Sequence, residues 1–145
     1  MAYAFFDTSA LIKRYVNEPG RLEVVQLLRK NHCVVSAILP VEVRGALRRR
    51  VAEGTLDETR IPPILKRFTA DRAFWTFIEV SREVLGAAEI LRAAHPLRAL
   101  EAIHVASAQL LAGRIVSPAF TVVSADVRQT TAAAALGLHT MHIES

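Results

Sequence analysis

Four of the 14 acidic residues in this 145-residue chain stand where the surrounding sequence is apolar or where an apolar run ends. Asp7 directly follows AYAFF, and Asp126 follows FTVVS after a single alanine. Glu42 lies within ILPVEV, and Glu101 interrupts the apolar stretch LRALEAIHVASAQLL. A buried carboxylate is costly unless it is paired or coordinated, so these four positions are the candidates for chemistry.

Four carboxylates that converge without a cation would repel one another and raise some of their pKa values. A hard divalent cation such as Mg²⁺ or Mn²⁺ removes that penalty, and oxygen ligands suit both ions. Such a cation lowers the pKa of a bound water and stabilises the charge that develops on a phosphodiester. The four acids therefore predict metal-assisted hydrolysis, provided that the fold brings them together.

Each acid also has a structural explanation. Asp is a good helix N-cap, so Asp7 and Asp126 could each cap a following helix, and for these two residues both interpretations stay open. Glu42 could lie beside Arg49 on one helical face. Glu101 is harder to explain in this way, because a helix that is apolar nearly all round is a buried helix.

The local partners available to Glu101 are Arg98, three residues before it, and His104, three residues after it. His104 could also act as a general base. Because it lies one turn from a carboxylate in a buried helix, we favour a hydrogen-bonded core histidine.

The elements that must position these acids follow from short apolar runs that alternate with longer amphipathic ones. Strands separated by helices, each strand nearly all apolar, indicate a parallel sheet covered on both faces. We therefore expect a three-layer α/β/α domain of five strands and about seven helices. The expected strands span residues 2–6, 33–36, 75–79, 119–123 and 138–142, and the expected helices span residues 8–16, 19–30, 38–53, 57–71, 81–94, 97–112 and 126–136.

Asp7 and Asp126 can meet only if the first and fourth strands are neighbours. Open parallel sheets bind ligands beyond the carboxyl ends of the strands, where the strand order reverses. If the order reverses between these two strands, both residues face one crevice. Helices that start beyond neighbouring strand ends would then bring Glu42 and Glu101 to its rim.

Length and composition indicate one globular domain over residues 1–145. Apolar residues make up 52% of the chain and charged residues 22%, which excludes a disordered chain. We expect neither a signal peptide nor a membrane span, because Asp7 interrupts the first apolar run and no uncharged stretch is long and apolar enough. The single cysteine, Cys33, allows no intramolecular disulfide, so we expect a cytoplasmic protein.

The basic residues are nearly all arginine, 15 Arg against 3 Lys, with a net charge of +4. The planar fork of arginine suits phosphate and carboxylate, which permits a nucleic acid or an acidic protein as partner. The densest cluster is RGALRRR, which begins two residues after Glu42. Within it Arg49 shares the helical face of Glu42 and could bind a substrate phosphate. The cluster could also be a solvated helix end, or meet an acidic partner segment.

The stretches FFDTSALIKRY, PVEVRGAL, LRALEAIHVASA and VVSADVRQTTAAAALGL resemble, in order and spacing, the motifs of the PIN-domain family. The similarity is greater to its toxin branch, the VapC-like ribonucleases of type II toxin–antitoxin pairs, and covers essentially the whole chain. The resemblance implies a sheet with strand order 3-2-1-4-5 and an endoribonuclease that depends on Mg²⁺ or Mn²⁺. It also implies an RNA substrate, a small cognate antitoxin as partner, and a homodimer.

The catalytic acids of the family carry over onto four positions of this chain: Asp7, Glu42, Glu101 and Asp126. Three of them, Asp7, Glu101 and Asp126, would hold the metal, and Glu42 would complete the site or orient the attacking water. The small hydroxyl positions of the family carry over onto Ser9 and Ser124, which would hydrogen-bond a metal-bound water or steady a carboxylate.

One position departs from the family pattern, because PIN proteins usually have Asp where this chain has Glu101. The extra methylene moves the carboxylate oxygens by roughly one C–C bond, at a site where Mg²⁺ requires near-octahedral geometry at ~2.0–2.1 Å. A site loosened by ~1 Å can lose on the order of 10²-fold in rate. The alternative function is therefore a PIN-fold module that binds RNA or protein and has a weakened or inactive metal site.

A third hypothesis is phosphoryl transfer through an aspartyl phosphate at Asp7. The Asp-x-Asp pattern of one such enzyme class is absent, because Ser9 stands at the second position. No Lys lies near the later strand ends to neutralise a phosphate. We rank this hypothesis last.

Overall fold

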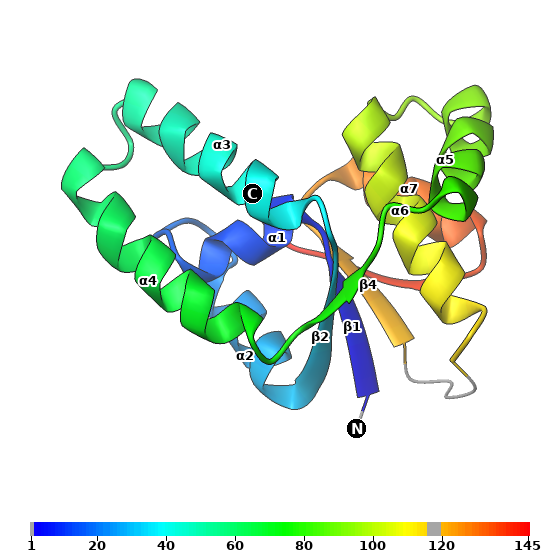
Figure 1. Ribbon diagram of the computed structural model, residues 1–145, viewed down its shortest axis with the longest axis horizontal. Coiled ribbons are helices and arrows are strands. Elements are labelled where there is room, and N and C mark those ends of the chain that lie inside the picture. The colour runs from blue at the N-terminus through cyan, green and yellow to red at the C-terminus, as the bar shows by residue number, and fades with distance from the viewer. Residues whose placement is uncertain (1, 116–119) are drawn as a thin grey trace.

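The computed structural model describes residues 2–115 and 120–145, and its centre is a five-stranded parallel sheet (Figure 1). The strands lie in the order β3-β2-β1-β4-β5, which confirms the expected fold. Residue 119 of the predicted fourth strand lies outside the described residues. The strands are β1 (Ala2–Phe6), β2 (Asn31–Ser36), β3 (Thr76–Ile78), β4 (Phe120–Ser124) and β5 (His139–His142).

Strand β1 lies at the centre of the sheet, between β2 and β4. Phe5 is aligned with Val34 on one side and with Val122 on the other. The chain winds outward from β1 in both directions, so the order reverses between β1 and β4. The backbone N–H of Asp7 donates to the carbonyl of Val123 at 3.2 Å, which ties the end of β1 to β4.

Helices cover both faces of the sheet, and successive strand residues alternate between them. One face packs Phe6, Val35 and Val123 against the helices from α1 to α4. The other packs Phe5, Val34 and Val122 against α5, α6 and α7. In the described residues, the helices are α1 (Thr8–Leu11), α2 (Arg21–Lys30), α3 (Leu39–Ala52), α4 (Ile61–Arg72), α5 (Arg82–Ala94), α6 (Ala99–Ala112) and α7 (Val127–Ala135), with 3₁₀ turns η1 (Ile12–Arg14) and η2 (Glu58–Arg60).

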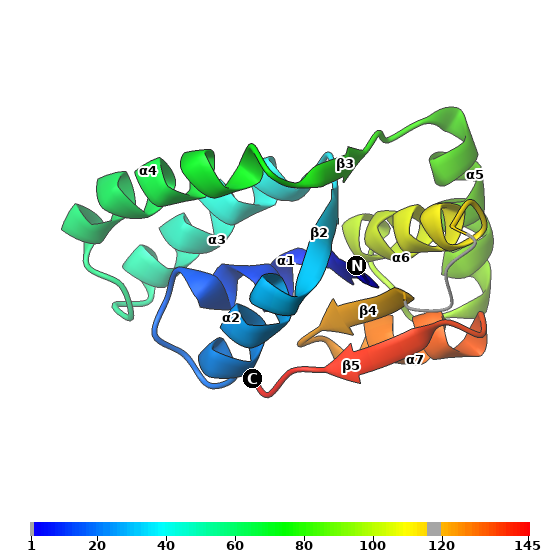
Figure 2. The same cartoon turned by 90° about the horizontal axis from the view of Figure 1, so that it is seen from below.

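Two predicted helices contain a change of helix type. The helix expected over 8–16 consists of α1 followed by η1, and the helix expected over 57–71 begins with η2. Helix α4 starts at Ile61, so Pro62 and Pro63 fall in its first turn, where a missing backbone N–H costs no helical bond. Helices α3 and α4 run side by side and extend away from the sheet (Figures 1 and 2).

Candidate active site

All four predicted acids lie at one edge of the sheet and line a single cavity of about 910 Å³. Asp7 directly follows β1, and Asp126 comes two residues after the end of β4. Glu42 lies in the first turn of α3 and Glu101 in the first turn of α6. Because the strand order reverses between β1 and β4, parallel strand ends and helix starts meet at this edge.

Two further predicted residues, Ser9 and Arg49, also line the cavity. Ser9 enters from α1, and Arg49 enters from the last turn of α3 with an exposed side chain. Ser124 does not line the cavity, but its hydroxyl donates a hydrogen bond to Oδ2 of Asp7. The fold thus brings the predicted acids and both serines into one polar neighbourhood, with Arg49 at its border.

Asp7 is 1% exposed and all of its described partners are neutral. The hydroxyl of Ser9 lies 2.8 Å from both carboxylate oxygens, and that of Ser124 lies 2.8 Å from Oδ2. The backbone N–H of Ala10 donates to Oδ1 at 3.1 Å. Burial raises the pKa of Asp7, and these hydrogen bonds together with the charge of His104 only partly offset that effect.

Glu42 is held by two side chains from other helices. Thr8 donates to its Oε1 at 2.7 Å, and Nε2 of His104 forms a short contact with the same oxygen. Burial alone would raise the pKa of Glu42, but the hydrogen bonds and charge of His104 and the Thr8 hydroxyl outweigh it and lower that pKa. His104 itself is 2% exposed, and its ring meets Phe5 edge-on at 6.4 Å between centroids.

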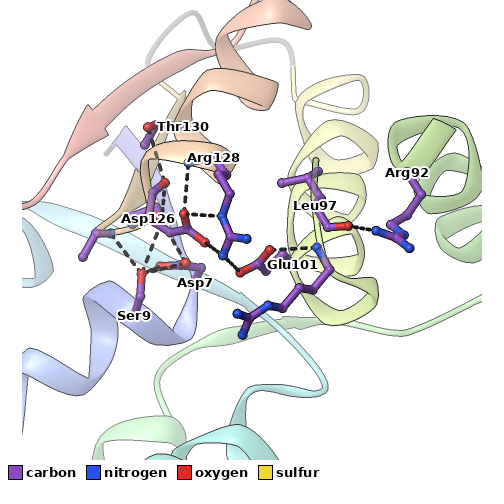
Figure 3. A network of polar contacts seen from close by, with 11 residues as sticks. Asp7, Ser9, Arg92, Leu97, Glu101, Asp126, Arg128 and Thr130 are labelled. Atoms are coloured by element: carbon purple, nitrogen blue, oxygen red, sulfur yellow. Dashed lines mark hydrogen bonds and ion pairs between the residues drawn. The ribbon is translucent and has the colours of Figure 1, made fainter. Parts of the chain in front are cut away.

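The other two acids share one arginine (Figure 3). The Nη2 atom of Arg128 lies 2.6 Å from Oε2 of Glu101 and 3.4 Å from Oδ2 of Asp126. Nε of Arg128 lies 3.4 Å from Oδ1 of Asp126, so the guanidinium bridges the two carboxylates. The other oxygen of Glu101 accepts the backbone N–H of Arg98 at 2.8 Å, at the start of α6.

The pKa values of Glu101 and Asp126 move in opposite directions. Burial, and then the neighbouring Asp126 carboxylate, raise the pKa of Glu101. Burial acts in the same sense on Asp126, but hydrogen bonds from Glu101 and from the backbone and side chain of Arg128 lower its pKa. Two acids whose pKa values are pushed apart in one cleft are typical of a functional site.

The structure confirms that both aspartates act as helix N-caps, and both also line the cavity. Asp7 caps α1 through Ala10, and Asp126 caps α7 through the backbone N–H of Arg128 at 3.0 Å. Capping orients each carboxylate toward the cavity. Glu101 pairs with neither of its expected local partners, because Arg98 contributes its backbone N–H and His104 contacts Glu42 instead.

Sequence reasoning missed Thr8 and Arg128. Thr8 is adjacent to Asp7, yet its hydroxyl points to Glu42, 34 positions along the chain. Arg128 lies in the first turn of α7, two residues after an N-cap aspartate, a spacing that lets the side chain fold back onto its own cap. That spacing could have predicted the contact of Arg128 with Asp126. Its contact with Glu101, which comes from α6, depends on tertiary packing.

The donor set of this site has the chemistry of a hard-cation site, because it consists of carboxylate and hydroxyl oxygens. A cation already lies between Glu101 and Asp126, in the form of the Arg128 guanidinium. In this arrangement, no three His, Cys, Asp or Glu side chains within 2–115 and 120–145 are grouped so that they could hold a metal ion. The donor types therefore fit a divalent ion, but for these acids to hold one both the carboxylates and the Arg128 side chain would have to move.

A family model described as the PIN domain matches residues 4–135, which is most of the chain. The chain belongs to the PIN-domain family. The matched residues of this PIN domain include all four acids of the cavity. A comparison with curated proteins found no match.

Three solved structures share the fold of this PIN domain. A toxin–antitoxin complex from Klebsiella pneumoniae is 21% identical with a TM-score of 0.60, and covers 87% of this chain and 88% of its own. FitAcB from Neisseria gonorrhoeae is 15% identical with a TM-score of 0.70 (95% and 96% covered). VapBC2 from Rickettsia felis, bound to a promoter DNA fragment, is 13% identical with a TM-score of 0.64 (98% and 99% covered). None of the helices in the described ranges is long and apolar enough to span a membrane.

Proposed function

We propose that this PIN domain is an endoribonuclease that hydrolyses RNA phosphodiester bonds and depends on Mg²⁺ or Mn²⁺. The observation that carries the proposal is the convergence of Asp7, Glu42, Glu101 and Asp126 on one cavity. Four carboxylates in one cleft are stable only with compensating positive charge, and a polyanionic substrate could approach them only after such compensation. Membership of the PIN family supports the same activity.

In this proposal Asp7, Glu101 and Asp126 hold the ion. When bound, a divalent ion activates a water and stabilises the charge that develops on the phosphate. Ser9 and Ser124 keep the Asp7 carboxylate in one orientation, since their hydroxyls contact both of its oxygens. Glu42, ionised through its contacts with His104 and Thr8, completes the site as the acceptor that orients the attacking water.

We propose further that the protein acts as the toxin of a toxin–antitoxin pair, in the cytoplasm and without membrane association. The similarity in fold to toxin–antitoxin complexes supports a small antitoxin protein as partner. A homodimer is the proposed assembly. We propose that Arg49, at the border of the cavity, binds a substrate phosphate.

The second candidate is a PIN-fold module that binds RNA or protein without cutting. The observation that favours it is the Arg128 bridge, which ties up two of the three proposed metal ligands. The long Glu101 side chain reaches both the backbone N–H of Arg98 and Arg128. An aspartate at this position, being one methylene shorter, would not reach both partners in the same geometry.

The test is cleavage of a mixed structured RNA pool by the purified chain with Mg²⁺, with Mn²⁺ or with excess chelator. Asp7→Asn serves as the inactive control, and Glu101→Asp tests the longer side chain. Cleavage that requires metal and disappears in Asp7→Asn supports the nuclease. Cleavage by Glu101→Asp alone favours the binding module, and cleavage that persists in Asp7→Asn rejects the assigned site.

A further inference from the structure

Two further cavities adjoin the carboxylate cavity, and arginines line both of them. The second cavity, of about 570 Å³, shares Glu18, Arg49 and Arg50 with the first. The third, of about 130 Å³, shares Tyr15, Arg21 and Arg60 with the second. Each cavity shares wall residues with the next, so the three lie in a row that leads away from the acids, and we call this row the arginine groove.

The residues that line the groove come from two parts of the fold, which lie side by side in Figures 1 and 2. One wall is the α3–α4 pair with η2, which carries Arg49, Arg60 and Arg67. The other is the segment from η1 to the start of α2, which carries Arg14 and Arg21. Both walls pack on the same face of the sheet, so the groove is a built feature of the domain.

Two of the acidic groups near the groove are already paired with arginines. Glu18 pairs with Arg50 at 2.5 Å, and Asp71 pairs with Arg14 at 2.9 Å. Asp57 accepts two hydrogen bonds from Thr59, at 2.9 and 2.8 Å.

Four groove arginines make no ion pair within the described residues: Arg21, Arg49, Arg60 and Arg67. In the described part of the chain, Glu53 and Asp57 are the two carboxylates of the second cavity without an ion pair, so the four arginines still leave the groove with an excess of positive charge.

The chemistry of the groove selects its occupant. Guanidinium groups bind phosphate through paired N–H donors, and contacts to a phosphate backbone carry no sequence information. The aromatic ring that lines the groove, Tyr15, is 5% exposed and packs against Phe68, so it offers no face for base stacking. An acidic peptide would need apolar anchor pockets, but nine of the twelve residues that line the second cavity are polar or charged.

We propose that this arginine groove binds the phosphodiester backbone of the RNA on one side of the cleaved bond. Arg49 contacts the phosphate nearest the carboxylates, because it lines both the first and the second cavity. Arg21, Arg60 and Arg67 contact phosphates farther along the strand. The proposal rests on the proposed nuclease function for its substrate and predicts backbone recognition that tolerates any sequence.

The test is the binding of fluorescent single-stranded RNA of mixed sequence to the full chain, with chelator present so that nothing is cut. The double variant Arg60→Gln/Arg67→Gln is compared with the matched control Arg29→Gln/Arg82→Gln. The control removes the same charge from two exposed arginines outside the groove. Each lost phosphate contact lowers the salt slope of binding by about 0.7 and affinity roughly 5-fold at 0.1 M salt.

We expect the groove variant to bind about 25-fold more weakly at 0.1 M salt, and its salt slope to fall by about 1.4. The control stays within a factor of two of the wild type. Equal losses in both variants would mean that net charge alone drives binding and would overturn the proposal. Binding of poly-glutamate, a model of an acidic protein segment, is measured in parallel. If the groove variant loses poly-glutamate binding but keeps its RNA binding, the proposal is overturned in favour of an acidic protein partner.

The two proposals fail in different ways. If the groove variant binds RNA more weakly but the wild type shows no metal-dependent cleavage, the nuclease proposal is rejected and the groove proposal stands. Metal-dependent cleavage with unchanged RNA binding in the groove variant would reject the groove and leave the nuclease.

Discussion

The acidic cavity has two halves that are held together by different means. In the half at the end of β1, core hydroxyls and a buried histidine hold Asp7 and Glu42. In the half formed by α6 and α7, the side chain of Arg128, which is 40% exposed, joins Glu101 and Asp126. The first half is preorganised by groups that cannot leave without disturbing the core. The second half is closed by a long side chain that can turn into solvent.

The two halves of the cavity therefore differ in how their acids affect the stability of the fold and the proposed binding of a metal ion. The buried Asp7 carries a cost that the fold tolerates, since burial raises its pKa. The Arg128 bridge instead satisfies two acids at the expense of the position that a metal ion would take. Four predictions test this comparison, from the largest expected effect to the smallest.

The first prediction is that Asp7→Asn loses cleavage and gains stability. Removing a residue that hydrogen-bonds a metal ligand typically lowers activity by about 10–100-fold, so removing the proposed ligand itself should lower cleavage by more than that. Because its folded pKa is raised above 3.8, Asp7 favours folding when protonated and loses that contribution as pH rises through its folded pKa. Asn removes the buried charge, so the free energy of unfolding, measured with denaturant, should be higher in the variant than in the wild type at pH 7. The two proteins should be equally stable below about pH 3.8, where the carboxyl group is protonated in both the folded and the unfolded state. Lower stability at pH 7 would contradict the assigned environment.

The second prediction concerns Ser124→Ala, which removes a buried hydroxyl from Asp7. Removing a group that hydrogen-bonds a metal ligand typically lowers metal affinity or activity by about 10–100-fold, so we expect losses of that order in both metal affinity and cleavage. The matched control is Ser107→Ala, which removes an equally buried hydroxyl that donates to Ile103. Titration calorimetry with Mn²⁺ measures the difference, and equal losses in both variants would reduce the role of Ser124 to packing.

The third prediction is that Arg128→Gln binds Mg²⁺ and Mn²⁺ several-fold more tightly than the wild type. The variant removes the cation that occupies the space between Glu101 and Asp126. Calorimetry reads this effect independently of cleavage. Arg114→Gln is the control, because it breaks an exposed pair with Glu83 far from the cavity. Weaker metal binding in Arg128→Gln would show that the bridge organises the acids for the ion.

The fourth prediction is that Glu42→Gln has the opposite sign to Asp7→Asn in stability. Because its folded pKa is lowered below 4.5, Glu42 contributes stability above that value and loses it as pH falls through its folded pKa. The variant should be less stable by about 1 kcal/mol at pH 7, a small value because solvent partly screens the group. The loss should disappear under acid conditions, and a pH-independent loss would indicate a packing defect instead.

The amino-acid sequence by itself determined the fold class and singled out the four acids that line the cavity. Apolar runs such as AYAFF can bury both faces of a strand only inside a covered parallel sheet, so the strands were predictable. Asp7 and Asp126 were also predictable as residues that follow strands. Pattern recognition needs only local spacing, and these elements are local.

Only the tertiary structure decided the distant partners of Glu42 and Glu101. Thr8 and His104 reach Glu42 across 34 and 62 positions of sequence, and Arg128 reaches Glu101 across 27. These partners come from different helices whose starts meet where the strand order reverses. The groove likewise combines arginines of the α3–α4 pair with arginines of the segment from η1 to the start of α2, and no periodicity in the chain relates them. Long side chains act over several ångströms from their backbone, so their partners depend on how the helices pack and not on how the sequence is spaced.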